Sequence, residues 1–256
     1  MTEQDKPAPF RPQAHDIATT LALLTRLPVR AKFDRTAQAV WAFPLAGLAV
    51  ALIAGAVATI SIWLSLGAAT TSALAIATGV IITGAMHEDG LADSADGLWG
   101  GWEPARRLAI MRDSHIGTYG VLALILAMLI RFSTLSTLAH AGVIVPALMG
   151  AAILSRAVIP FTMALLPPAR TDGLSVQTGR PPRRAAVLAA LIALGLSWIV
   201  VGFVPTVLAA SAATAIGFGV GALAKAKIGG QTGDILGATQ LICELATLLT
   251  FAALAT

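Results

Sequence analysis

The sequence predicts an all-α protein, a polytopic membrane bundle of about seven transmembrane helices, with six as the alternative. Of its 256 residues, 57% are hydrophobic and only 12% are charged, against about 45–50% and about 25% in ordinary soluble domains. Aromatic residues make up only 5% of the chain, whereas 24 residues are glycine. Small residues let membrane helices approach one another closely. The composition therefore favours helices packed in lipid over a soluble core.

The expected spans are stretches of about 20 mostly apolar residues, the length that crosses a bilayer as a helix. In chain order they cover residues 38–62, 70–86, 119–138, 142–166, 185–203, 205–224 and 236–255. No internal repeat of the kind that builds inverted-repeat transporters is visible. We therefore expect residues 1–256 to form a single integral membrane domain.

The basic residues predict how these spans are oriented. All Lys and Arg residues except Arg131 and Arg156 lie outside the spans, in segments 1–37, 87–117, 167–184 and 225–235. The positive-inside rule places these four segments in the cytoplasm, together with the N-terminus. The formal net charge is only +4, and because the bases lie in these short segments they indicate membrane orientation rather than binding to nucleic acid.

Residues 1–37 carry no leading apolar block, so we expect a cytoplasmic N-terminal segment rather than a cleavable signal peptide. An amphipathic helix is expected here, either lying on the membrane surface or capping the bundle. Its apolar stripe is Ile17, Leu21, Leu24 and Leu27, with Asp16, Thr20 and Arg26 off that stripe.

An acidic segment follows the second expected span. Residues 87–97 contain four of the 13 acidic residues, namely Glu88, Asp89, Asp93 and Asp96. If the segment is helical, the three aspartates project from one face, where their like charges call for a neutralising cation. Clustered carboxylates suit Mg²⁺ together with substrate phosphates. The alternative is a solvated helix end whose aspartates cap turns. Residues 87–117 are thus predicted to form an acidic cytoplasmic catalytic loop.

A basic stretch follows within the same loop. Arg106, Arg107 and Arg112 are candidates to bind phosphate oxygens through their planar guanidinium groups, or they are ordinary anchors at the membrane face. Asp113 would complete the metal site or act as a base.

The remaining candidates lie within or beside the spans. Arg131, Arg156 and Glu244 are costly in hydrocarbon and are expected to face the bundle interior, where Arg156 and Glu244 lie at similar depth and could form an ion pair. Asp234 begins the last span after a glycine-rich segment. It is either an N-cap or a further carboxylate for substrate or metal.

Three segments in order, HEDGLADSADG (87–97), RLAIMRDSHIGTYG (107–120) and GQTGDILG (230–237), resemble the cobalamin synthase family, whose formal name is adenosylcobinamide-GDP ribazoletransferase. The similarity extends to residues 24–28, 43–47 and 167–173. Ser175 departs from it, because glycine is expected there. The resemblance implies Mg²⁺-dependent joining of adenosylcobinamide-GDP to α-ribazole, or to its 5′-phosphate, with release of GMP.

Carried onto this chain, the family's acidic, Asp-Ser and Gly-Asp motifs fall on Asp89, Asp93 and Asp96, on Asp113, and on Asp234. The roles that we predict for individual residues come from their chemistry. Mg²⁺ on the first three aspartates would bridge the diphosphate, with Asp93 catalytic as well as metal-binding, and Asp113 would accept the proton of the attacking ribazole hydroxyl. Substrate-binding roles fall to Arg106, Arg107, Arg112, Arg156, Asp234 and Glu244.

The expected location is a bacterial cytoplasmic (inner) membrane, with the active site facing the cytoplasm and lipid around the spans. Self-association, or association with other cobalamin-assembly enzymes, is a further expectation. The alternatives are a transporter that uses Arg131, Arg156 and Glu244, a related CDP-alcohol-type phosphotransferase, and a non-catalytic subunit that binds corrinoid for a soluble partner.

Overall fold

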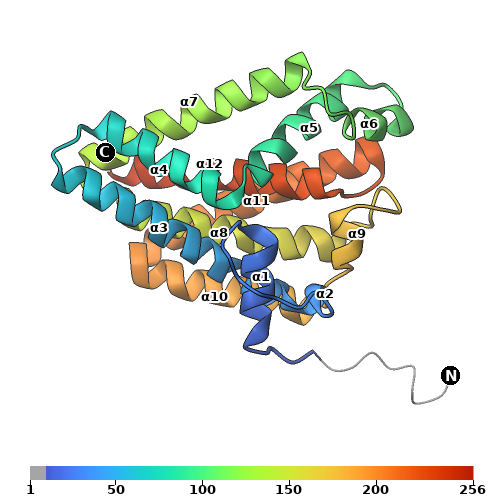
Figure 1. The fold of residues 1–256 in the computed structure, drawn as a ribbon, viewed down its shortest axis with the longest axis horizontal. Coiled ribbons are helices and arrows are strands. Elements are labelled where there is room, and N and C mark those ends of the chain that lie inside the picture. The colour runs from blue at the N-terminus through green and yellow to red at the C-terminus, as the bar shows by residue number, and fades with distance from the viewer. Residues whose placement is uncertain (1–9, 256) are drawn as a thin grey trace.

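The computed structural model describes residues 10–255, and within this range the chain is helical, with one isolated bridge between Pro168 and Gln231 as its only strand-like pairing. The elements are α1 (His15–Leu24), α2 (Thr36–Ala39), the 3₁₀ turn η2 (Val40–Ala42), α3 (Phe43–Trp63), α4 (Ala68–Thr83), α5 (Met86–Gly100), α6 (Pro104–Ile110), α7 (Thr118–His140), α8 (Ile144–Leu165), α9 (Leu174–Thr178), α10 (Arg183–Val201), α11 (Phe203–Ile228) and α12 (Gly233–Ala255). Figure 1 shows the long helices side by side.

Six stretches in the described part of the chain are long and apolar enough to cross a membrane: Thr36–Trp63, α7, α8, α10, α11 and α12. A seventh is obtained if α4 and α5 count as one broken span. The prediction of an all-α, multi-pass membrane bundle is therefore confirmed. The second span differs from expectation because α4 ends at Thr83 and α5 leaves it at an angle of 86°.

Helices α8 and α12 form the centre of the bundle. In each, 72% of the most apolar window is buried, against 28% in α7, α10 and α11. The outer helices expose large apolar side chains, such as Leu126 and Leu129 on α7 and Ile199 on α10, which suits contact with lipid. Gly47 lets α3 cross α8 closely, since a β-carbon there would lie 2.2 Å from the Ala152 carbonyl oxygen.

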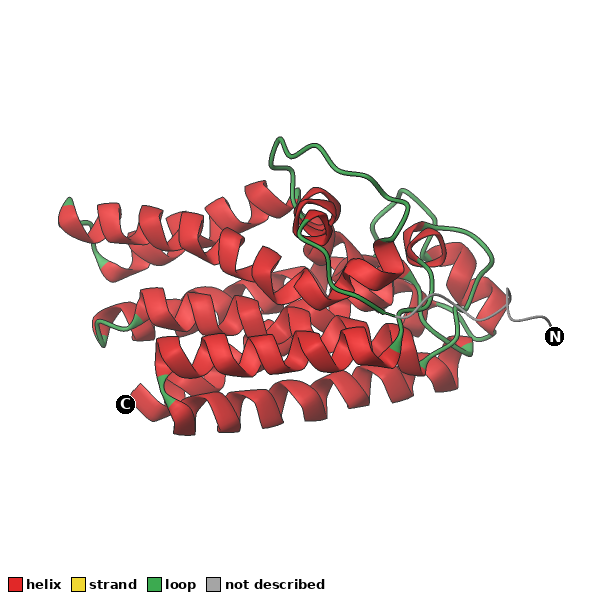
Figure 2. Cartoon of the chain, turned by 90° about the horizontal axis from the view of Figure 1, so that it is seen from below, coloured by secondary structure: helices red, strands yellow, loops and turns green. Residues whose placement is uncertain are grey.

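The longer loops gather at one end of the bundle (Figure 2). We call this the loop end, and it comprises segments 25–35, 101–117, 166–173 and 229–232 together with α1, α6 and α9. The opposite end has only short joins, at residues 64–67, 141–143 and 202. The last turns of α12 lie at this opposite end (Figure 1).

Helix α1 packs on the bundle with its polar side facing inward. Asp16 and Thr20, which were expected to lie off the buried stripe, are 0% and 1% exposed. Trp41 donates its indole N–H to Asp16 at 2.8 Å, and the Thr20 hydroxyl donates to the Ala39 carbonyl at 3.1 Å. These hydrogen bonds explain why polar residues of α1 are buried, since a buried polar group is costly only when it lacks a partner.

Candidate active site

A break between α4 and α5 sets the direction of the acidic helix. Gly84 and Ala85 both adopt left-handed backbone conformations, with φ of 64° and 57°. Arg26 supports the break, because its backbone N–H donates to the Ile82 carbonyl at 2.7 Å and its side chain packs directly over Gly84. Left-handed backbone at alanine is unfavourable and persists only where the surroundings hold it. The contacts with Arg26 therefore hold the break between the two helices, and the break sets the direction of α5.

Helix α5 crosses the first turns of α12 at a point where both helices carry a glycine, Gly90 and Gly237. A β-carbon on Gly90 would lie 2.8 Å from the Asp234 carbonyl oxygen and 3.1 Å from Gly237 Cα. A β-carbon on Gly237 would lie 3.2 Å from the Met86 carbonyl oxygen. The close crossing brings the acidic face of α5 next to the N-terminal turn of α12.

Replacing Gly90 by Val is therefore expected to push α5 away from α12 and to lower the free energy of unfolding by about 1–3 kcal/mol, the typical cost of an overpacked contact. The measurement is unfolding of the purified variant in a defined detergent. Gly219→Val is the matched control, because a β-carbon at Gly219 has no neighbour within 4 Å. Wild-type stability in Gly90→Val would contradict the close packing of α5 against α12.

Four aspartates, Asp89, Asp93, Asp96 and Asp234, form a group that we call the acidic cluster, with Asp93 at its centre. Asp93 is half-buried, and the negative charges of the other three act on it, with Arg170 as the opposing positive charge. Asp89 lies one turn away on α5 and is exposed. Like charges at this density repel one another unless a cation neutralises them. The arrangement is chemically suited to a divalent ion or to a ligand that brings one.

Asp96 differs from its neighbours because both of its oxygens have backbone partners. It is 7% exposed and accepts hydrogen bonds from the N–H groups of Gly117 at 2.7 Å and Gly120 at 2.9 Å. These are free N–H groups at the start of α7, where a carboxylate is favoured by the helix dipole. Asp96 thus fixes the N-terminus of α7 to α5.

Two loops from distant parts of the chain bring an arginine to the cluster. The Ala169 N–H donates to the Gln231 carbonyl at 2.8 Å, and the Gln231 N–H donates to the Pro167 carbonyl at 2.9 Å. The Arg170 guanidinium then donates to Asp234 at 3.1 Å, and both side chains are mostly buried.

The N-cap of α12 is Thr232 rather than Asp234. The Thr232 hydroxyl oxygen accepts the Ile235 N–H at 3.3 Å, and the Thr232 carbonyl accepts the Leu236 N–H at 3.1 Å. The interpretation of Asp234 as an N-cap was wrong, because the capping side chain lies two residues earlier. Asp234 is left to pair with Arg170 and to accept the Thr232 hydroxyl at 3.1 Å.

Asp113 lies in the exposed loop between α6 and α7. Its carboxylate accepts the backbone N–H of His115 at 3.1 Å and lies 2.7 Å from the Nδ1 atom of the same residue. These hydrogen bonds, the side-chain one foremost, lower the pKa of Asp113, so it is a weaker base than a free carboxylate. No contact in the structure joins Asp113 to the aspartates of α5.

The three loop arginines have different surroundings. Arg107 donates to the carbonyl oxygens of Gly101 at 2.9 Å and Lys227 at 2.8 Å, and thereby ties α6 to the end of α11. Arg112 forms an exposed ion pair with Asp172. Arg106 is exposed and is the one whose guanidinium lies open to a ligand at the loop end.

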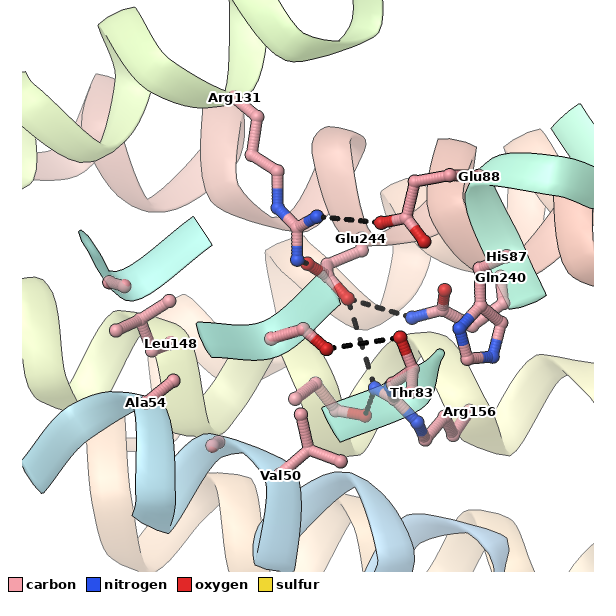
Figure 3. A pocket seen from close by; sticks show the side chains of 14 residues that line it. Val50, Ala54, Thr83, His87, Glu88, Arg131, Leu148, Arg156, Gln240 and Glu244 are labelled. Carbon is pink, nitrogen blue, oxygen red and sulfur yellow. Dashed lines mark hydrogen bonds and ion pairs between the residues drawn. The ribbon is translucent and has the colours of Figure 1, made fainter. Parts of the chain in front are cut away.

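The buried charges form a second polar cluster, deeper in the bundle (Figure 3). Arg131 on α7 pairs with Glu88 at 3.1 Å and with Glu244, while Arg156 on α8 lies 3.8 Å from Glu244. Gln240 donates to Glu244 at 2.7 Å. The predicted pairing of Arg156 with Glu244 is confirmed. Two arginines here balance two glutamates, which is the condition for burying charge in a membrane.

The acidic cluster offers carboxylates for a metal ion but does not form a complete set of protein ligands by itself. Within residues 10–255, no three His, Cys, Asp or Glu side chains lie close enough to hold a metal ion on their own. Mg²⁺ does not require this, because it commonly takes one or two protein carboxylates and completes its shell with water and substrate phosphates. Asp93 and Asp89, whose oxygens are not used by backbone N–H groups, fit that pattern.

Sequence reasoning missed several residues of the site. Arg170 and Thr232 were not identified as contributors, although both lie in segments that carried the family resemblance. Glu88 was counted with the other acids of its segment, but it points into the buried cluster. His87 on α5 was also missed; it is 3% exposed and lines the same buried cavity as Glu88, Arg156 and Glu244.

Fold and site together define a multi-pass membrane protein with a carboxylate-rich polar site at one end of its helix bundle. The family described as cobalamin-5-phosphate synthase matches residues 16–252. The chain belongs to this family.

Curated relatives named adenosylcobinamide-GDP ribazoletransferase match along most of their length. The protein from Bradyrhizobium diazoefficiens is 43% identical, with 93% of each chain covered. The protein from Azorhizobium caulinodans is 41% identical, covering 91% of this chain and 94% of its own. The protein from Mesorhizobium japonicum is also 41% identical, with 91% of each chain covered. No solved structure matches significantly.

Proposed function

We propose that this chain joins adenosylcobinamide-GDP to α-ribazole, or to α-ribazole 5′-phosphate, with release of GMP. The carboxylate cluster around Asp93 carries the proposal together with the family membership, because transfer from a diphosphate needs a site that organises phosphate and cation. The buried arginines and glutamates that suggested a transporter are paired with one another. They therefore give no specific support to a transport pathway.

Asp93 and Asp89 are the carboxylates that we propose for Mg²⁺, and Asp234 lies across from them on α12. Bound Mg²⁺ would neutralise charge on the diphosphate and its leaving group. Of the three predicted metal ligands, Asp96 is the least suited to bind Mg²⁺, because both of its carboxylate oxygens already accept hydrogen bonds from backbone N–H groups. Its role here is to position the aspartates by tying α5 to α7.

Arg170 is the cation that we propose for the substrate phosphates, since it lies beside Asp234 and acts on Asp93. Arg106 is exposed, and we propose it as a second candidate to bind these phosphates. We place the proton acceptor in the Asp113–His115 pair. Asp113 would hold the Nδ1 side of the imidazole, which leaves Nε2 to take the proton of the attacking hydroxyl.

The proposed location is the bacterial inner membrane, with the loop end in the cytoplasm. The basic segments that precede α3, precede α10 and end α11 all lie at this end, as the positive-inside rule requires of a cytoplasmic face. Self-association and association with other cobalamin-assembly enzymes stay predictions.

The experiment is GMP release by the purified chain in nanodiscs, supplied with adenosylcobinamide-GDP, α-ribazole and Mg²⁺. Release is expected only with both substrates, to stop when EDTA removes the divalent ion, and to return when Mg²⁺ is added in excess. A well-folded chain that releases no GMP under these conditions would contradict the proposal. It would favour the alternative of a non-catalytic subunit that binds corrinoid for a soluble partner.

A further inference from the structure

A pocket lies beside the acidic cluster, bounded by α1, α8 and α9 and by the N-terminal residues of α3, α5 and α12. Its walls are largely apolar, and the side chains that build them include Leu24, Phe43, Met86, Met163 and Leu236. These residues come from five different helices, α1, α3, α5, α8 and α12. A pocket with apolar walls and few polar groups is the usual form of a small-molecule site.

Two residues that line this pocket each carry a buried polar atom without a hydrogen-bond partner in the described structure, and one of them, His87, also lines the buried charged cluster (Figure 3). The Ser175 hydroxyl on α9 is buried, with the residue 4% exposed, and His87 Nε2 on α5 is buried, with the residue 3% exposed. Leaving such groups unsatisfied costs roughly 1–3 kcal/mol each. A hydrocarbon chain would leave both without a partner, whereas a ligand with polar atoms at its edges would satisfy them.

The pocket lies within about two helical turns of the proposed metal carboxylates Asp89 and Asp93. Gly233, which lines it, is followed directly by Asp234, and Met86 and His87 precede Asp89 on α5. Gly237, which also lines the pocket, forms the close crossing with Gly90. The pocket and the acidic cluster therefore adjoin where α5 crosses α12.

We propose that this pocket binds the aromatic base of the acceptor nucleoside, with Ser175 and His87 contacting the edge of the heterocycle. The proposal rests on the function proposed above and identifies the acceptor subsite of that reaction. A flat heterocycle buries two apolar faces against the Phe and Met walls and carries polar atoms only at its edge. The nucleoside ribose would then extend past Gly233 toward Asp234 and Asp93.

Ser175 gives a direct test of the assignment, because it lines the pocket and its buried hydroxyl has no hydrogen-bond partner. Ser175→Ala is expected to weaken α-ribazole binding about two- to tenfold, the range for one net hydrogen bond, whereas removal of a purely structural serine would leave nucleoside affinity unchanged.

Gly233 lines the pocket and can accept a β-carbon, so a larger side chain there is expected to occupy the pocket. A β-carbon there has no neighbour within 4 Å and the backbone is not left-handed. Gly233→Leu is expected to weaken binding of α-ribazole alone by about tenfold or more in nanodiscs, measured by isothermal titration calorimetry. In turnover, KM for the nucleoside should rise while KM for adenosylcobinamide-GDP stays within twofold. Gly219→Leu, on the outer face of α11 with equally open surroundings, is the matched control.

Unchanged nucleoside affinity in Gly233→Leu, or equal loss of affinity for both substrates, would overturn the assignment. If Gly233→Leu fails to fold, Ser175→Ala decides the matter by the same titration. The two proposals fail differently. Wild-type protein that binds the nucleoside but releases no GMP would contradict the proposed function, whereas GMP release with pocket-independent nucleoside binding would contradict only this inference.

Discussion

Replacing Asp93 by Asn is expected to reduce the rate of GMP release by on the order of 10²–10³-fold, the loss seen when one group that stabilises transition-state charge is removed. Asp93 is the most central of the acidic residues, since the charges of Asp89, Asp96 and Asp234 all act on it. Asn keeps the shape of the side chain but removes the negative charge that would hold the cation. The measurement is the initial rate at saturating substrates over a range of Mg²⁺ concentrations.

The matched control is Asp34→Asn, because Asp34 is an exposed aspartate at the same end of the molecule. It should keep the wild-type rate. Both variants should elute and melt as the wild type does, so that lost folding is excluded. A rate within threefold of wild type in Asp93→Asn would remove Asp93 from the proposed metal site.

Replacing Arg131 by Met is expected to destabilise the folded protein by about 3–5 kcal/mol, the cost of breaking a buried ion pair by removing one partner. Arg131 pairs with both Glu88 and Glu244, and all three are less than one-tenth exposed. Its loss leaves Glu88 without a counterion in the bundle interior. The measurement is equilibrium or thermal unfolding in a defined detergent.

Arg184→Met is the control for this effect, because Arg184 is exposed at the start of α10. The double variant Arg131→Met with Glu88→Gln should recover part of the lost stability, since it removes the unpaired charge while Arg156 still faces Glu244. A single variant as stable as Arg184→Met would mean that the buried cluster contributes nothing to the fold.

The span positions were predictable because long apolar stretches follow directly from the thickness of a bilayer. The bend between α4 and α5 was not, since the apolar character of residues 70–86 runs through it without interruption. The local signal is Gly84, but one glycine in a span does not specify a bend of 86°. The bend depends on contacts with Arg26, which is far away in the sequence.

The acidic segment was identified from its density of carboxylates, but the spacing of these residues does not show that they have different partners. Asp96 accepts hydrogen bonds from the N-terminus of α7, and Glu88 forms an ion pair with Arg131 in the bundle interior. Both assignments depend on which helices pack against α5. The Arg170–Asp234 pair likewise joins a loop to the first turn of α12 across 64 residues of sequence, and a sequence without contact information gives no reason to connect them.

The central claim is that the α5 aspartates hold a divalent cation together with the diphosphate substrate. Its most direct test is electron paramagnetic resonance of Mn²⁺, as a substitute for Mg²⁺, with the protein in nanodiscs and adenosylcobinamide-GDP present. Wild type is predicted to bind Mn²⁺ in a substrate-dependent manner and Asp93→Asn to lose that binding, while Asp34→Asn keeps it. Equal Mn²⁺ binding by wild type and Asp93→Asn would contradict the account.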